Sequence, residues 1–211
     1  MQNKSIIIII SILILSFIGA VVYGKISEQQ APKSSGSNHI YGKTDSKVTL
    51  TEFVDFQCEA CYSYYPIVKE VKEKYKDKVK FQIKIFPISS SHQYSRMATK
   101  YAEAASVQGK FIEMHDKIFE GQKEWETAEK PQVYFETYAK ELNLNMDQLK
   151  TDIANKFVDS IIEADMNELR SLGGKGTPTF VLNGKLIDNP EQSTEAFSKI
   201  LDDALEQADT K

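Results

Sequence analysis

Cys58 and Cys61 are the residues best suited to chemistry in this 211-residue chain, and they are its only cysteines. A Cys-x-x-Cys pair can form a structural disulfide, part of a metal site or a redox-active pair. A disulfide that closes a loop over two residues removes little entropy from the unfolded chain, and a chain that is 41% hydrophobic can build a core without one. A zinc site needs about four ligands, whereas the histidines lie far apart at His39, His92 and His115. The sequence therefore favours a redox-active pair and predicts neither a metal nor a cofactor.

The position of Cys58 between two elements suggests how the pair would react. The apolar alternation of residues 47–56 is typical of a strand, and a helical pattern follows Cys61 as far as about Tyr75. Free backbone N–H groups at a helix N-terminus stabilise a thiolate, which is the nucleophile of disulfide exchange. We expect Cys58 to be the exposed attacking cysteine and Cys61, one turn later, to be its more buried partner.

The elements around this pair indicate an α/β domain. Residues 78–88 form a second alternating strand, and residues 89–172 carry helical patterns that stop at Gly173-Gly174. Residues 177–187 contain Asn183-Gly184, a strong hairpin signal, and an amphipathic helix closes the chain. A β-α-β unit followed, after a helical block, by a β-β-α unit makes one mixed sheet flanked by helices.

The N-terminus predicts a membrane-tethered protein. Residues 6–23 are uncharged and apolar, and the stretch from Ser5 to Gly24 has about the length that crosses a bilayer. A cleaved signal peptide has a shorter apolar core and an A-x-A-like site, so we expect an uncleaved signal-anchor after a cytoplasmic N-terminus, residues 1–5. A flexible tether, residues 24–40, would follow, with the catalytic domain on the extracytoplasmic side of the cell membrane, where conditions oxidise dithiols.

Charge gives no sign of a nucleic-acid partner. The net charge is −4, and the lysine-dense stretch KEVKEKYKDKVK, residues 69–80, is interleaved with acidic residues. At helical spacing this pattern is typical of a solvated face. We expect no binding of nucleic acid.

Three motifs resemble a known family. Cys58-Glu59-Ala60-Cys61 follows an apolar strand, Pro66 comes five residues later, and Gly176-Thr177-Pro178-Thr179 precedes a strand and the Asn-Gly hairpin. From Tyr41 to Ala208 the chain is similar to the thioredoxin superfamily, and within it to the DsbA-like thiol:disulfide oxidoreductases, including the membrane-tethered BdbD type. The resemblance implies a thioredoxin fold over residues 41–88 and 173–208, with an all-helical subdomain inserted at residues 89–172.

The resemblance also implies roles and partners. Cys58 would attack and Cys61 would be its partner, while Pro178 would be a cis-proline beside the disulfide, with Thr177 presenting backbone to an extended substrate. Reduced exported proteins would be the substrates. A quinone-linked membrane protein resembling DsbB or BdbC would re-oxidise the pair.

Glu52 is a candidate proton carrier. It alternates with Leu50, Val54 and Phe56, so the strand would bury its carboxylate in an apolar layer. Burial without a partner raises the pKa of an acid towards neutrality, which suits exchange of protons with Cys61. The resemblance agrees, because a buried acid is common six residues before the first cysteine of this family. At an edge of the sheet, or beside a lysine, Glu52 would instead be an ordinary acid.

The residues between the cysteines, Glu59 and Ala60, depart from the family's strong oxidants, which often carry Pro-His. An acidic side chain beside Cys58 is expected to destabilise its thiolate and weaken the oxidant. Three hypotheses follow. The first is an oxidase that donates disulfides to exported proteins. The second is a membrane-tethered reductase or isomerase of the same fold. The third is a non-catalytic module that binds clients and has no need of both cysteines.

Overall fold

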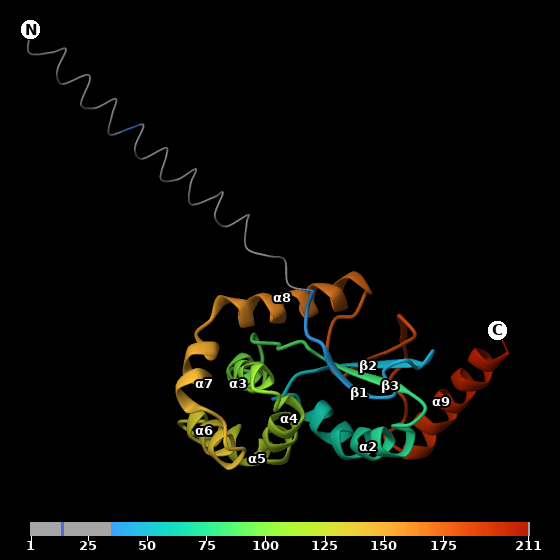
Figure 1. Cartoon of the computed structure of the whole chain (residues 1–211), viewed down its shortest axis with the longest axis horizontal. Coiled ribbons are helices and arrows are strands. Elements are labelled where there is room, and N and C mark those ends of the chain that lie inside the picture. The colour runs from blue at the N-terminus through green and yellow to red at the C-terminus, as the bar shows by residue number, and fades with distance from the viewer. Residues whose placement is uncertain (1–13, 15–34, 211) are drawn as a thin grey trace, which may run out of the picture. The chain divides into compact units, whose positions relative to one another are not determined.

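The computed structural model describes residue 14 and residues 35–210 (Figure 1). Apart from Ile14, the predicted cytoplasmic N-terminus and signal-anchor lie outside the described residues, as does most of the predicted tether. Within the part of the chain that is described, no helix is long and apolar enough to cross a membrane.

The domain is built on a five-stranded mixed sheet with the strand order β1-β3-β2-β4-β5. Strands β2 and β3 run parallel, and the other neighbouring strands pair antiparallel. The strand bounds are His39–Gly42 (β1), Thr49–Val54 (β2), Lys80–Ile85 (β3), Thr179–Leu182 (β4) and Lys185–Ile187 (β5). The predicted β-α-β and β-β-α units therefore meet in one sheet, with β2 at its centre.

Helices lie on both faces of this sheet and beyond one end of it (Figure 1). Their bounds are Glu59–Tyr75 (α2), Ser95–Val107 (α3), Phe111–Glu120 (α4), Gln122–Trp125 (α5), Gln132–Glu141 (α6), Met146–Ile153 (α7), Lys156–Ser171 (α8) and Thr194–Asp209 (α9). Helices α7 and α8 are separate, because Asn155 caps a new helix by accepting a hydrogen bond from the N–H of Phe157.

Each face of the sheet has its own apolar core. Helices α2 and α9 cover one face, where Val68 and Leu201 pack with Phe180. Helix α8 covers the other face, where Leu169 packs with Phe53. The helical insertion is thus not a separate unit, since its last helix forms one layer of the sheet domain.

The largest apolar cluster joins the sheet to the inserted helices. It contains Cys58 and Cys61 together with Phe56, Ile118 and Trp125, all of them buried. The cysteine pair therefore lies where the insertion meets the C-terminal end of β2.

The folded domain begins before the predicted boundary at Tyr41, so the predicted tether is too long. Ser37 is buried, and its N–H and hydroxyl donate to the carboxylate of Asp165 at 2.9 and 2.5 Å. His39 opens β1, which the sequence analysis missed, and its ring stacks on Phe111 with 3.3 Å between ring centroids. Residues 37–40 are thus part of the fold.

The Asn-Gly hairpin is confirmed. Asn183 and Gly184 connect β4 to β5 with φ angles of 50° and 79°. Two successive positive φ angles are what a tight hairpin turn requires, and asparagine and glycine adopt them with the least strain.

Candidate active site

Cys58 caps the N-terminus of α2, at the end of the loop that leaves the central strand. Its backbone is extended, with φ −76° and ψ 122°, and its carbonyl accepts the N–H of Tyr62 at 3.0 Å. Both cysteines are free thiols. Cys58 is 8% exposed and Cys61 1%. The expectation of an exposed Cys58 is therefore wrong, although Cys58 does line an open surface pocket and is the more accessible of the two.

The environment of Cys58 favours its thiolate. The hydrogen bond from the Cys61 thiol is the main cause that lowers the pKa of Cys58, to about 5, against the opposing effect of burial. The backbone N–H groups of Cys61 and Ala60 stabilise the thiolate further, as expected at a helix N-terminus.

The environment of Cys61 has the opposite effect. Burial, followed by its hydrogen bond to Cys58 and the negative charge there, raises the pKa of Cys61 well above its usual value. In the reduced pair one proton therefore stays on Cys61 while Cys58 is ionised at neutral pH.

The loop before β4 lies against Cys58. The Thr177–Pro178 peptide bond is cis, as the family resemblance implied. In the thiol form Cys58 Sγ donates to the carbonyl of Thr177 at 3.4 Å, and Asn189 Nδ2 holds the loop by donating to the carbonyl of Pro178 at 3.0 Å. The structure thus brings Thr177, Pro178 and Cys58 together.

Gln122 is a site residue that sequence reasoning missed. Its side chain is fully buried, and Nε2 donates to the carbonyl of Phe56 at 2.6 Å and to that of Cys58 at 3.4 Å. It connects α5 of the insertion to the loop that carries the cysteines. No pattern in the sequence distinguishes Gln122 from the other glutamines.

Asp55 organises the loops around the pair. It is fully buried, and its carboxylate accepts the backbone N–H groups of Gln57 at 2.9 Å and Ile88 at 2.7 Å, as well as the hydroxyl of Ser95. The Nδ1 atom of His92 also lies 2.7 Å from this carboxylate. Asp55 thus connects the start of α2, through Gln57, to the segment that follows β3, through Ile88 and His92.

Glu52 is buried as expected. It lies on β2, between β3 and β4, and is 6% exposed. Burial raises the pKa of Glu52 to about 7, and the positive charge of Lys72 opposes the rise. Glu52 does not lie at an edge of the sheet, so the first alternative to a proton carrier is wrong. The second alternative, a neighbouring lysine, is correct only in that Lys72 is present, because the pKa of Glu52 stays near neutrality. The carboxylate of Glu52 makes no hydrogen bond with Cys61 or with any other residue between 35 and 210.

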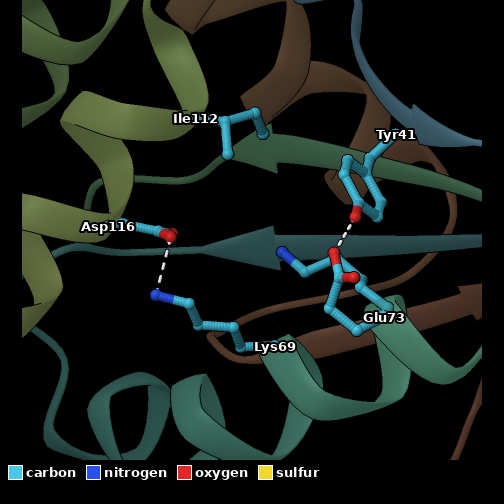
Figure 2. A pocket seen from close by; sticks show the side chains of 6 residues that line it. Tyr41, Lys69, Glu73, Ile112 and Asp116 are labelled. Carbon is cyan, nitrogen blue, oxygen red and sulfur yellow. Dashed lines mark hydrogen bonds and ion pairs between the residues drawn. The ribbon is translucent and has the colours of Figure 1, made fainter. Parts of the chain in front are cut away.

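The buried position of Lys72 contradicts the expectation that residues 69–80 form a solvated face. Lys72 is 8% exposed, and burial lowers the pKa of its ammonium group, against the opposing charge of Glu52. It lines a cavity of about 80 Å³ with Lys69 and Asp116, which form an ion pair of 2.9 Å (Figure 2). A lysine among charged neighbours thus turns inward, towards the buried acid.

Glu59 contributes less than the sequence suggested. Its side chain is 85% exposed, and its carboxylate lies 3.9 Å from Nζ of Lys123. An exposed and partly neutralised charge is strongly screened, and the pKa of Cys58 falls to about 5 beside it. Ala60 contributes through its backbone N–H alone.

Metal-binding geometry is not found among residues 35–210, where no group of three or more His, Cys, Asp or Glu side chains is placed to hold an ion.

Comparison with known proteins gives the family. Residues 34–203 match the family model described as thioredoxin. The chain is 27% identical over 212 residues to the probable disulfide bond formation protein D of Bacillus anthracis, covering 95% of each protein. It is also 31% identical over 183 residues to the Na⁺/H⁺ antiporter NhaA 3 of Salinispora tropica, covering 87% of this chain but 27% of the antiporter. The chain thus spans about a quarter of the length of that curated relative.

Solved structures give the fold. BdbD from Bacillus subtilis in its oxidised form superposes with a TM-score of 0.66 at 24% identity, over 79% of this chain and 92% of that one. α-DsbA1 from Wolbachia pipientis superposes with a TM-score of 0.70 at 18% identity, over 81% and 92% of the two chains. With the sequence match over residues 34–203, these likenesses lead to one conclusion: the chain belongs to the thioredoxin family.

Proposed function

We propose that this chain is an extracytoplasmic thiol:disulfide oxidoreductase that donates the Cys58–Cys61 disulfide to reduced exported proteins. The polarisation of the pair is the observation that carries the proposal, because the pKa of Cys58 is lowered to about 5 while that of Cys61 is raised well above its usual value. A stabilised thiolate stabilises the reduced enzyme, and a stable reduced form makes the disulfide a strong oxidant.

The reaction takes place in two exchanges. A substrate thiolate attacks Sγ of Cys58, a substrate–Cys58 bond forms, and the Cys58–Cys61 bond breaks with its electron pair on Cys61, which takes up a proton. A second substrate thiolate then attacks the substrate sulfur of the mixed disulfide, and Cys58 leaves as a thiolate. The substrate loses two electrons and gains a disulfide, and the enzyme leaves in the dithiol form.

Glu52 supplies the proton that Cys61 needs in this scheme. An acid with a pKa of about 7 is protonated often enough to donate and ionised often enough to accept near neutral pH. The two side chains share no hydrogen bond, so this proposal requires a water molecule to carry the proton between them.

The membrane tether belongs to the same proposal. A signal-anchor over residues 6–23 would hold the domain outside the membrane, close to emerging exported chains and to a DsbB- or BdbC-like quinone-linked protein that re-oxidises Cys58 and Cys61. The name of the similar Bacillus anthracis protein, disulfide bond formation protein D, supports this role.

The reduction potential tests the proposal. The compact unit Ser34–Lys211 would be equilibrated with glutathione buffers, and the fraction of oxidised pair measured by thiol labelling and mass spectrometry. We expect a value towards the oxidising end of the family, about −120 mV. A value near about −270 mV would overturn the oxidase and favour the reductase. Cys61→Ser is the control, because it cannot form the intramolecular disulfide.

A further inference from the structure

His92 lies in the pocket that gives access to Cys58. Besides these two residues, the pocket is lined by Gln57, Glu59, Ala60, Glu126 and Thr127. The His92 side chain is 23% exposed and comes from the segment between β3 and α3, which is distant from the cysteines in sequence. A substrate thiol that reaches Cys58 through this pocket would come close to the imidazole.

Asp55 fixes the orientation of this imidazole. Its carboxylate lies 2.7 Å from Nδ1 of His92 and is itself held by two backbone N–H groups and the hydroxyl of Ser95. A carboxylate only accepts hydrogen bonds, so Nδ1 carries a proton and Nε2 is the atom left to accept one. Nε2 has no hydrogen-bond partner among residues 35–210.

The same aspartate connects the imidazole to Cys58. The backbone carbonyl of Asp55 accepts the N–H of Cys58 at 3.1 Å, so one residue sets the positions of both the histidine and the reactive sulfur. A base oriented by a buried acid next to a reactive sulfur is an arrangement that activates thiols.

We propose that His92 is the general base that takes the proton of the incoming substrate thiol, so that Cys58 is attacked by a thiolate paired with an imidazolium. This inference rests on the proposed exchange chemistry and adds the residue that prepares the substrate for it. It also gives a role to a histidine that lies outside the Cys-x-x-Cys motif. Within that motif, Glu59 and Ala60 provide no proton acceptor that is fixed beside the sulfur.

The atoms balance in this step. The substrate S–H proton moves to Nε2 of His92, the substrate sulfur bonds to Sγ of Cys58, and the Cys58–Cys61 bond breaks. Cys61 leaves with the electron pair and takes a proton from the side of Glu52. The imidazolium then loses its proton to solvent before the second substrate thiol arrives. No additional oxidant is needed, because the disulfide itself accepts the two electrons.

Charged groups face the pocket from three elements. Asp55 faces the ring from the end of β2, and Glu59 and Glu126 line the pocket from α2 and from the end of α5. Lys123 partly neutralises the last two, at 3.9 Å from Glu59 and 3.0 Å from Glu126. Asp55 is therefore the acid in direct contact with the ring, and its hydrogen bond to Nδ1 holds the imidazole in place.

The test is a pH profile. The oxidised full-length protein, in detergent, would be mixed with a short unstructured peptide carrying two cysteines, and the rate of disulfide transfer followed by acid quenching and mass spectrometry for wild type and His92→Gln. At pH 6–7 we expect His92→Gln to be slower by about tenfold or more. The two rates should converge above about pH 9, where the peptide thiol ionises without help.

Two further measurements separate this role from a structural one. Thr127→Val alters the same pocket without a titrating group, so its effect should be independent of pH. Added imidazole should restore the rate of His92→Ala at low pH and have no effect near pH 9. A His92→Gln effect of equal size at every pH, or no rescue by imidazole, would overturn the inference.

The outcomes also separate this inference from the proposed function. If the oxidised wild type oxidises no peptide at any pH while the reduced protein reduces a peptide disulfide, the oxidase proposal fails. The comparison of wild type and His92→Gln is then made in that direction, where the His92 imidazolium would protonate the leaving peptide thiolate. A deficit confined to one part of the pH range supports the role of His92, and a constant deficit overturns it.

Discussion

The redox pair has an outer side and an inner side, and both take an acid from the same stretch of chain. We call Cys58, Asp55 and His92 the outer side. We call Cys61 the inner side, together with Glu52, its proposed proton donor, and Lys72, whose charge acts on Glu52. Asp55 and Glu52 are both buried, at 0% and 6% exposed. The carboxylate of Asp55 accepts hydrogen bonds from two N–H groups and a hydroxyl and contacts His92, whereas the carboxylate of Glu52 has no hydrogen bond with any residue between 35 and 210.

This difference shows that burial alone does not decide what an acid does. Hydrogen bonds compensate the buried carboxylate of Asp55, which becomes a fixed support for the loop and the imidazole. Without them, burial raises the pKa of Glu52 to about 7, so this acid can exchange a proton near neutrality. The outer side is thus arranged to hold charge, and the inner side to move a proton.

The largest expected effect is a difference in stability between the two redox forms. The pKa of Cys58 in the folded dithiol is lowered from 9.0 to about 5. Its contribution to stability is therefore complete above about pH 9 and is lost as the pH falls through 5. After allowance for solvent screening of a thiol that lines an open pocket, we expect the reduced protein to be the more stable form by about 2 kcal/mol at pH 7.

Denaturant unfolding of both forms between pH 5 and 8 measures this gap. It should shrink towards pH 5, and Cys58→Ser, which has no disulfide form, should lack the pH dependence of stability that the reduced wild type shows. An oxidised form that is the more stable one at pH 7 would contradict the polarised pair.

Glu52→Gln removes the proton donor of the inner side. We expect disulfide transfer at pH 7 to slow by about 10- to 100-fold, because Cys61 must then leave without an adjacent acid. Stability should change in the opposite sense. A pKa raised from 4.5 to about 7 means that Glu52 destabilises the fold as the pH rises through this window, so the variant should gain about 2 kcal/mol above pH 7. Equal loss of rate and of stability would instead indicate a purely structural residue.

Lys72→Met makes the inner side more apolar. Because the charge of Lys72 lowers the pKa of Glu52, its removal should raise that pKa further above 7, by about one unit. The infrared band of the protonated carboxyl group, identified by its absence in Glu52→Gln, reports the shift. Lys69→Met is the matched control, since Lys69 lines the same cavity but pairs with Asp116 and Glu120. Equal shifts in the two variants would show that the charge of Lys72 has no specific effect on the pKa of Glu52.

Glu59→Gln should have the smallest effect, although this residue adjoins Cys58 in sequence. Its side chain is 85% exposed, and exposed charges contribute about 1 kcal/mol or less. We expect the equilibrium constant with glutathione to change by less than about threefold. A tenfold change would restore the sequence-based interpretation, in which Glu59 sets the strength of the oxidant.

The sequence predicted the parts of the site that depend on local pattern. The strand, the cysteines at the start of α2 and the buried position of Glu52 follow from alternation and spacing, and the Asn183-Gly184 turn follows from its residue types. The family resemblance predicted the cis peptide bond before Pro178.

What the sequence could not predict depends on contacts between distant segments. Lys72 is one lysine among several in a charged helix, and only the packing of α2 on the sheet turns it inward. The contact of His92 with Asp55 spans 37 positions, and Gln122 reaches Phe56 across 66. Polar side chains of this kind acquire their roles from tertiary structure, and hydrophobic periodicity does not reveal them. The early strand β1 was missed because its four residues are too short to show a pattern.

Titration of the thiols tests the central claim most directly. The ultraviolet absorbance of the thiolate would be followed with pH in the reduced protein, with Cys58→Ser as the reference. The polarised pair predicts one thiolate that appears near pH 5 and is absent in Cys58→Ser, and no second thiolate until well above pH 9. Two thiols ionising together near pH 9 would contradict the polarisation of the pair, and with it the oxidase.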